Sequence, residues 1–275
     1  MAEPLDVEVA ALARAPAPAA AFFDVDNTLV RGASAFHLVR ELHRRGFFTI
    51  ADIAFFAWHL LGYFLAGENK KKMGAARDRA LGIIRGRSVA EIVAIAEDVY
   101  DDVLERKVFP GTRTLLEGHL AAGHEVWLIT AGPQEIGRLI AHRLGATGAV
   151  CTVAEEKDGY YTGRLVGRMM HGAAKASAAG QIAEQGGFDL ADCYAYGDSV
   201  NDIPILGAVG HPCAVNPEPR LRLHCAQVGW PVRDFRRKRS TVRRKVGNTA
   251  GTAGAAWLAS LVVRALRRRG QPGRS

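Results

Sequence analysis

Residues 20–30 read Ala-Ala-Phe-Phe-Asp-Val-Asp-Asn-Thr-Leu-Val and change abruptly from apolar to acidic. The apolar run that ends at Phe23 is typical of a buried strand. Open α/β sheets place their chemistry at the carboxyl ends of strands, so Asp24 and Asp26 can serve one site if the chain bends between them. The alternative is a plain turn, because Asp and Asn favour turns.

Later stretches repeat this pattern and favour a site. The strand predicted at 124–129 runs into Thr130-Ala131-Gly132-Pro133, and the strand predicted at 193–196 opens onto a Gly-Asp-Ser-Val-Asn-Asp segment. A helix predicted over 173–186 carries a lysine near its start. Together these elements present one set of polar side chains: Asp24, Asp26, Thr130, Lys175, Asp198 and Asp202.

The surrounding sequence alternates strand and helix patterns, which predicts an α/β fold. The further elements expected are helices at 112–122 and 133–144, a strand near 148–153, a hairpin strand at 161–166 after an Asp-Gly turn, and a strand at 212–215 followed by a Pro-rich loop.

Residues 33–108 interrupt the alternation with helical periodicity and no strand pattern. Ser34 can cap a first helix, and amphipathic helices are expected at 73–85 and 88–107. This segment therefore predicts an all-helical insertion into the α/β core.

Part of the insertion, residues 47–66, is apolar over the roughly 20 residues that a membrane span requires. Asp52 and His59 lie inside it, and charge at membrane depth is costly. A helix buried against other helices is therefore the favoured interpretation, and a membrane-facing patch is the alternative.

Charge is distributed unevenly along the 275 residues, whose formal net charge is +8. Residues 233–275 hold 13 of the 36 Lys and Arg but only one of the 28 acids, Asp234, which leaves 23 basic and 27 acidic residues before them. Basic clusters flank an apolar segment at 249–263 that is too short to span a bilayer. This tail is equally compatible with reversible attachment to an anionic membrane surface and with docking on the protein itself. Binding to nucleic acid is the least favoured interpretation.

The first 19 residues form an expected flexible lead-in, because they are acidic and Pro-interrupted where a secretory signal is basic and apolar. The four cysteines show no metal-binding or disulfide spacing, which predicts buried or incidental thiols in a reducing cytosol. We therefore expect a cytoplasmic protein. Peripheral attachment to the inner face of the membrane is the additional interpretation that the basic tail allows.

The ordered set of motifs resembles the haloacid dehalogenase-like hydrolases over about residues 20–217, and within them the phosphoserine phosphatase-like branch with a small helical cap. The resemblance implies a doubly wound, Rossmann-like parallel sheet. The catalytic core would comprise residues 20–32 and 109–232, and the cap residues 33–108.

The family's chemistry assigns roles to the matching positions. Asp24 would attack phosphorus and form an aspartyl-phosphate, and Asp26 would protonate the leaving oxygen and then activate water. Lys175 would neutralise charge in the transition state, and Thr130 would hydrogen-bond a phosphoryl oxygen. Taken singly, Thr130 could instead cap a helix and Lys175 could be a solvated surface residue.

The resemblance also implies Mg²⁺, which prefers oxygen ligands. Its expected ligands are Asp24, the backbone carbonyl of Asp26, and Asp198, with Asp202 binding directly or through water. Backbone N–H groups near Val25 and Ala131 would complete the phosphate site, beside Thr130 and Lys175.

The expected substrate is a small phosphate monoester. Phosphoserine phosphatases typically carry an acid soon after the first motif, but here no acid occurs until Glu41, and Thr130-Ala131-Gly132 replaces the usual Ser-Gly-Gly. The aromatic residues of the predicted cap suit a more apolar ester, or they simply pack. Phosphotransfer to an acceptor other than water and a non-catalytic regulatory role are the alternative functions.

Overall fold

The computed structural model describes residues 19–47, 52 and 78–236. These residues fall into two compact units. The first contains residues 19–38, 90–154 and 165–236, and the second contains residues 39–47, 52, 78–89 and 155–164. The predicted lead-in up to residue 18 and the tail from residue 237 lie outside the described part.

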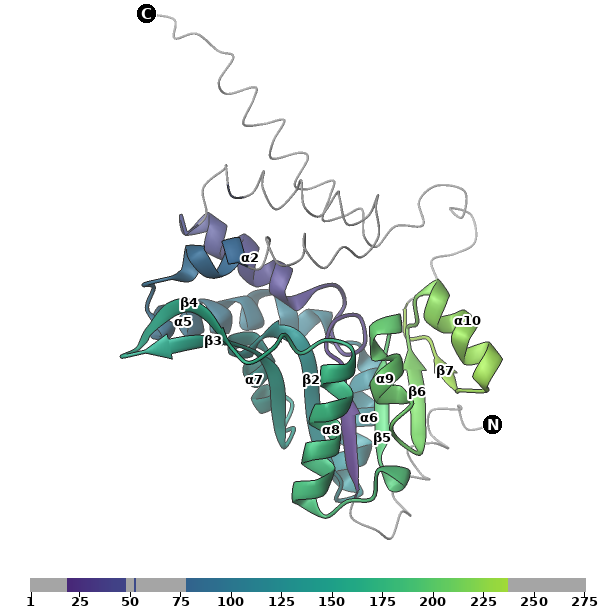
Figure 1. The fold of residues 1–275 in the computed structure, drawn as a ribbon. Helices are drawn as coiled ribbons and strands as arrows, with labels where there is room; N and C mark the ends of the chain where they lie inside the picture. The colour runs from purple at the N-terminus through teal and green to yellow at the C-terminus, as the bar shows by residue number, and fades with distance from the viewer. Residues whose placement is uncertain (1–18, 48–51, 53–77, 237–275) are drawn as a thin grey trace, which may run out of the picture. The chain divides into compact units, whose positions relative to one another are not determined.

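A seven-stranded sheet forms the framework, with the order β4-β3-β2-β1-β5-β6-β7 (Figure 1). The strands are β1 (Ala20–Phe23), β2 (Glu125–Pro133), β3 (Gly148–Lys157), β4 (Tyr160–Val166), β5 (Tyr194–Gly197), β6 (His211–Val215) and β7 (Val232–Arg233). The pairings from β3 through β7 are parallel, and β1 lies between β2 and β5. The predicted α/β parallel sheet is confirmed.

Helices connect the strands. They are α2 (Ser34–Arg44), α5 (Val89–Val99), α6 (Pro110–Ala121), α7 (Gln134–Arg143), α8 (Ala173–Gly186), α9 (Ile203–Leu206) and α10 (Pro219–Val228). A π-helical segment and a 3-10 turn, Tyr100–Leu104 and Glu105–Lys107, extend α5, and further 3-10 turns lie at Leu190–Asp192 and Val200–Asp202.

The loop predicted after β6 is present but short, at residues 216–218, and α10 follows it directly. Pro219 occupies the first turn, where a missing N–H breaks no helical hydrogen bond. Gly229 ends the helix with a φ of 78°, a conformation that glycine adopts without steric cost.

The core of the first unit forms on both faces of the sheet, because side chains alternate along β1. Phe22 belongs to an apolar cluster with residues of α8, α9 and α10. Phe23 points to the other face, where it stacks on Tyr196 and meets His119 of α6 edge-on. Helices therefore cover both faces, as a doubly wound sheet requires. The four cysteines are free and buried, as predicted.

Residues 233–236, predicted as the start of the tail, belong to this core. Arg233 pairs with Val215 in the sheet. Asp234 accepts bonds from Arg222 at 2.9 Å and from Arg236 at 2.7 Å. The ring of Phe235 lies against Gly111, so closely that a Cβ there would overlap it.

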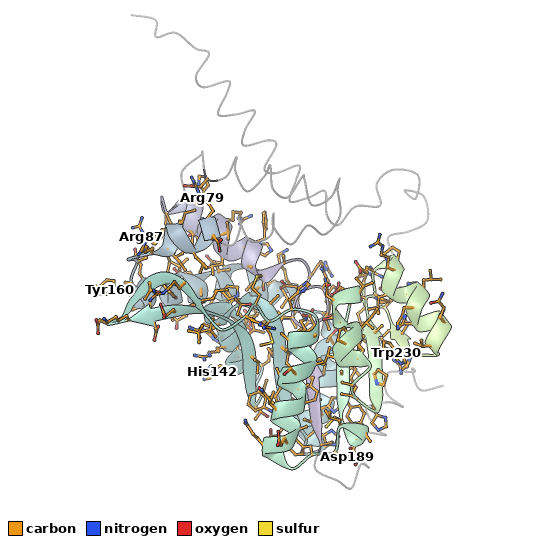
Figure 2. All side chains as sticks on the ribbon, viewed as in Figure 1. Arg79, Arg87, His142, Tyr160, Asp189 and Trp230 are labelled. Atoms are coloured by element: carbon orange, nitrogen blue, oxygen red, sulfur yellow. The ribbon has the colours of Figure 1, made fainter. Side chains whose placement is uncertain are left out.

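The second unit joins the tip of the β3–β4 hairpin to residues 86–89. The Val89 N–H donates to Gly159 O at 2.9 Å, and the Tyr161 N–H donates to Arg87 O at 3.0 Å. Tyr160 is exposed at this tip (Figure 2). The hairpin part of this unit comes from residues 155–164, outside the predicted cap, and residues 90–108 of the predicted cap belong to the first unit. The cap bounds 33–108 stay a prediction.

The apolar stretch at 47–66 is described only at Phe47 and Asp52. Asp52 is buried and accepts two bonds from Arg79, at 2.6 and 3.0 Å, so the charge inside this stretch has a partner. Among the described residues no helix is both long and apolar enough to cross a membrane.

Candidate active site

The chain bends sharply after β1. The N–H groups of Leu29 and Val30 both donate to Val25 O, and Asn27 adopts a φ of 61°. Asn tolerates this left-handed conformation better than most residues. The turn that was the alternative to a functional site is therefore present. It also bends the chain, which a site containing both Asp24 and Asp26 requires.

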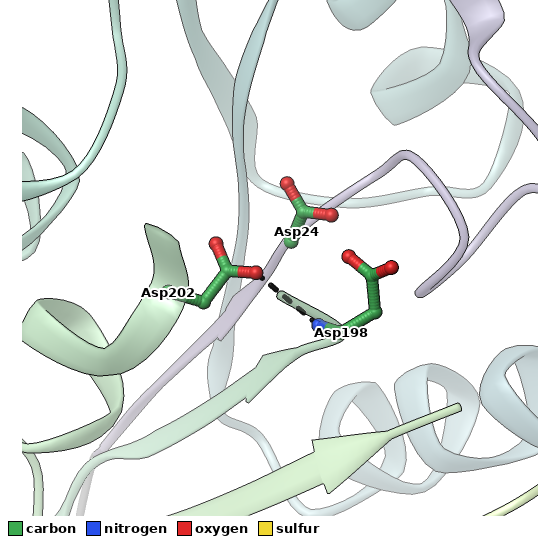
Figure 3. A group of neighbouring side chains, drawn as sticks. All are labelled: Asp24, Asp198 and Asp202. Carbon is green, nitrogen blue, oxygen red and sulfur yellow. Dashed lines mark hydrogen bonds between the residues drawn. The ribbon is translucent and has the colours of Figure 1, made fainter. Parts of the chain in front are cut away.

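Three carboxylates from different elements lie together at the carboxyl ends of the central strands (Figure 3). Asp24 follows β1, Asp198 follows β5, and Asp202 ends the next 3-10 turn. One oxygen of each lies within 4.8 Å of the others. Gly197 permits this approach, because a Cβ on it would lie 2.5 Å from Asp202 Cβ.

Asp202 has both carboxylate oxygens occupied. Its Oδ2 accepts bonds from the Asp198 N–H at 3.2 Å, the Ser199 N–H at 3.1 Å and the Ser199 hydroxyl at 3.0 Å. Its Oδ1 accepts a bond from Lys175 at 2.6 Å. These bonds fix its position and leave it better suited to hold a water of a metal ion than to bind the ion directly.

Lys175 joins two of the acids. It lies in the first turn of α8, and its Nζ donates to Asp24 Oδ1 at 2.5 Å and to Asp202 Oδ1 at 2.6 Å. Its exposed fraction is only 4%, which excludes a solvated surface lysine. Burial opposes its charge, but the carboxylates of Asp24 and Asp202 raise the pKa of Lys175 and keep it protonated.

Burial and the excess of acids over cations raise the pKa values of Asp24 and Asp198. Burial, reinforced by Asp202 and Asp26 and opposed by Lys175, raises the pKa of Asp24 to about 7. Burial and the charges of Asp24 and Asp202 raise the pKa of Asp198 to about 9. A bound cation would relieve this repulsion.

Asp26 is set apart from the cluster by its own partner. Its Oδ1 accepts a bond from the Ser34 N–H at 2.8 Å. Burial raises the pKa of Asp26, and interactions with Ser34 partly lower it. A carboxyl with a raised pKa is suited to donate a proton to a leaving oxygen.

The predicted phosphate loop lies at the end of β2, which runs four residues beyond the predicted strand with a shift in register. Thr130 is 2% exposed, and its Oγ1 accepts a bond from the Gly132 N–H at 3.0 Å. It does not cap α7, whose N-cap is Pro133. The Ala131 carbonyl accepts a bond from Thr152. The phosphate-binding roles of the Val25 and Ala131 N–H groups stay predictions.

The carboxylate cluster fits a divalent cation. In the described part of the chain no donor contacts Asp24 Oδ2 or the carboxylate of Asp198, so these oxygens face the cluster without a partner. Hard oxygen donors of this kind suit Mg²⁺, which retains several waters. Asp24 and Asp198 would bind it directly, with Asp202 beside them.

Three supporting residues were not identified from the sequence. Ser199 and Glu218 fix the loop that follows Asp198. The Ser199 hydroxyl donates to Asp202. The Glu218 carboxylate accepts a bond from the Val200 N–H, and the Glu218 N–H donates to Asp198 O. Asn216 is buried with a φ of 49° and donates to Asn27 O at 2.9 Å, while its Oδ1 accepts the Phe235 N–H at 2.7 Å. The only sequence signal for these three supporting residues is the position of Asn216 directly after a strand.

Comparisons with known proteins agree with this geometry. A family model described as haloacid dehalogenase-like hydrolase matches residues 21–207. A relative from Mycobacterium tuberculosis named phosphoserine phosphatase SerB1 is 49% identical over 249 residues, which cover 90% of this chain and 80% of the relative.

Solved structures share the fold. A Bordetella pertussis protein of unknown function has a TM-score of 0.71 and 32% identity, and the match covers 80% of this chain and all of that one. A phospho-aspartyl intermediate analogue of phosphoserine phosphatase has a TM-score of 0.56 and 19% identity, covering 79% of this chain and 93% of that one.

Proposed function

This chain belongs to the haloacid dehalogenase-like hydrolases and is a phosphatase, and we propose that it hydrolyses a small phosphate monoester through an aspartyl-phosphate on Asp24, with Mg²⁺ as its cofactor. The observation that supports this most is the cluster of buried Asp24 and Asp202 and half-buried Asp198 with Lys175. Lys175 lies within hydrogen-bond distance of Asp24 and opposes the rise in the pKa of Asp24, which favours the ionised form that a nucleophile needs.

The two steps use the two acids after β1 differently. A carboxylate oxygen of Asp24 bonds to phosphorus as the ester bond breaks, and Asp26 gives its proton to the departing oxygen. Asp26 then takes a proton from water, which attacks phosphorus and releases Asp24 and inorganic phosphate. When bound, Mg²⁺ would supply positive charge against the phosphoryl oxygens.

Lys175 and Thr130 would stabilise the charge that moves through these steps. Lys175 supplies a fixed positive charge beside Asp24, and its burial strengthens that interaction. The Thr130 oxygen already accepts the Gly132 N–H, so its own hydrogen is oriented away from Gly132 and can be donated to a phosphoryl oxygen.

The test is hydrolysis of a panel of phosphate monoesters with and without Mg²⁺, by wild type and Asp24→Asn. We expect Mg²⁺-dependent release of phosphate that Asp24→Asn abolishes, together with loss of beryllium fluoride binding and an unchanged fold by circular dichroism. Wild-type turnover by Asp24→Asn would exclude Asp24 as the nucleophile. Added alcohols test the phosphotransfer alternative, which predicts new phosphate esters.

The substrate is proposed as phosphoserine or a more apolar ester. The relative named phosphoserine phosphatase supports the first, whereas the absence of an acid between Asp26 and Glu41 supports the second. The panel should therefore include phosphoserine and lysophospholipid-like esters. The ratio of their kcat/KM values decides between the two.

For the basic segment 237–275 we propose reversible attachment to an anionic membrane surface. Each Lys or Arg near such a surface contributes about 1 kcal/mol, and salt screens the attraction. We expect sedimentation with phosphatidylserine-containing vesicles at low salt, release at high salt, and no sedimentation after truncation at Arg236. Absence of binding at low salt would exclude this role and leave docking on the protein.

A further inference from the structure

Ser34 lies beside the proposed catalytic groups although it belongs to none of the motifs. It is the first residue of α2, it is 1% exposed, and its N–H donates to Asp26 Oδ1 at 2.8 Å. This bond fixes the carboxyl of the proposed acid from the backbone. A side chain at this position therefore lies next to the reacting groups.

The Ser34 hydroxyl is buried without a hydrogen bond of normal geometry. Within the described residues its Oγ completes none, although it lies near enough to Asp26 to interact with that carboxyl. A buried hydroxyl without a partner destabilises the folded state, because its lost hydrogen bonds to water are not replaced. Such a group is retained most simply where a ligand supplies the missing partner.

The surroundings of the hydroxyl indicate where that partner would lie. A Cβ built on Gly132 would be 3.7 Å from Ser34 Oγ and 3.2 Å from Thr130 Oγ1. Both hydroxyls thus border the space that the absent side chain of Gly132 leaves beside the phosphate loop. Two O–H groups near one point, next to Asp26, suit a tetrahedral oxyanion better than a carbonyl or an amine.

Resting on the proposed phosphatase function, we infer that the Ser34 hydroxyl donates a hydrogen bond to a phosphoryl oxygen of the bound ester, opposite Thr130. Its N–H orients Asp26 at the same time, so one residue couples substrate binding to the position of the acid. Ser34 is then a further substrate-contacting residue, and Gly132 is required because any side chain there would occupy the place of that oxygen.

Ser34→Ala tests the inference, because it removes the hydroxyl but keeps the N–H that holds Asp26. A hydrogen bond to a charged group is worth about a tenfold change in affinity or more. We expect Ser34→Ala to weaken binding of orthovanadate in the presence of Mg²⁺ by about that factor and to lower kcat/KM equally. Ser177→Ala, the same change at an exposed position of α8, should change neither.

The pH profile separates substrate contact from a structural role. If the hydroxyl only tuned Asp26, Ser34→Ala would shift the pH profile of kcat and leave vanadate affinity unchanged, which would overturn the inference. Ser34→Thr should restore vanadate affinity if its methyl group is accommodated. If Ser34→Thr does not fold, Ser34→Cys, a similar volume with a weak donor, should bind vanadate as poorly as Ser34→Ala.

Gly132→Ala provides an independent test, because it places a methyl group in the space between the two hydroxyls. We expect a folded protein whose vanadate binding is reduced more than in Ser34→Ala. Normal binding by either variant in an active enzyme would overturn the inference and leave the phosphatase function standing. If wild type hydrolyses no ester, the proposed function fails, and vanadate affinity alone then decides the role of Ser34.

Discussion

The two ends of the central strands bury polar groups in opposite ways. At the carboxyl ends, Lys175 pairs with Asp24 and Asp202, and Asp198 lies beside them. At the amino ends, imidazole and phenol groups gather instead: His119, His124, Tyr194, Tyr196 and His211. One end has an excess of acids, and the other consists of aromatic side chains joined by hydrogen bonds and ring contacts.

Three of these side chains, His119, His124 and Tyr196, form a hydrogen-bonded chain, which we call the neutral chain. His119 Nδ1 lies 2.9 Å from His124 Nδ1, and His119 Nε2 lies 2.9 Å from the Tyr196 hydroxyl. His124 Nε2 is buried without a partner among the described residues. We assign the His124 proton to Nδ1, which donates to His119, because the other tautomer would bury an unpaired N–H.

The difference shows where a ligand is needed. Burial, with smaller contributions from His124 and His211, lowers the pKa of His119 to about 3, so the neutral chain needs no ion. At the other end burial raises the pKa values of Asp24 and Asp198, and only added positive charge would complete the set. Acids with too little compensating positive charge thus mark the functional end of the sheet.

The largest effect is expected from Lys175→Met, which removes the cation and leaves two buried acids facing each other. We expect kcat to fall about 100- to 1,000-fold, and the folded state to require more Mg²⁺. Lys157→Met, at an exposed lysine, is the control and should retain activity. Steady-state kinetics over a range of Mg²⁺ concentrations measure kcat and the Mg²⁺ requirement. A near-normal kcat in Lys175→Met would contradict the role of Lys175 as a positive charge in the site.

A pair of truncations probes the support of the charged end. Truncation after Arg236 should preserve stability and activity on a soluble ester. Truncation after Val232 removes Phe235 and the Asn216 bond to it, and we expect about 3 kcal/mol less stability from lost apolar burial and hydrogen bonds. Urea unfolding of both forms measures this. Equal stability of the two would mean that residues 233–236 contribute nothing to the core.

His119→Phe breaks the neutral chain and should cost about 2 kcal/mol at pH 7, because His124 and Tyr196 lose a partner. Activity per folded molecule should not change. The folded pKa of His119, about 3, lies below the unfolded value of 6.5, so the unfolded state takes up the proton first as the pH falls. Wild type therefore loses about 3 kcal/mol through His119 between pH 7 and pH 4.

The variant lacks this loss, so its stability deficit should shrink as the pH falls towards 4. Urea unfolding at several pH values measures the two curves. His119→Gln, which keeps hydrogen-bonding capacity without a titrating ring, serves as the second variant. A deficit that stays constant with pH would show that folding does not lower the pKa of His119.

The smallest effect is expected from Tyr196→Phe. It removes one hydroxyl from the end of the chain and leaves the ring stacked on Phe23, so we expect a loss of about 1 kcal/mol. Tyr160→Phe, at an exposed hydroxyl, should change nothing. A fall in kcat of Tyr196→Phe would instead link the two ends of the sheet.

The sequence by itself predicted the sheet, its chemically active edge and the family, because these depend on short patterns. An apolar run ended by a polar residue identifies a strand and its carboxyl end from a few neighbouring residues, and three such ends in order limit the topology. The same reasoning predicted the set Asp24, Thr130, Lys175, Asp198 and Asp202, which the structure brings to one edge. Their roles stay proposals.

Only the tertiary structure decided which partner each group meets. Lys175 contacts Asp24 across 151 residues, and Asn216 bonds to Asn27 across 189 residues and to Phe235 across 19. Ser34 has the sequence signature of an ordinary helix start, yet it is buried against Asp26. Burial and pairing depend on packing between distant segments, and neither residue spacing nor local propensity encodes that packing.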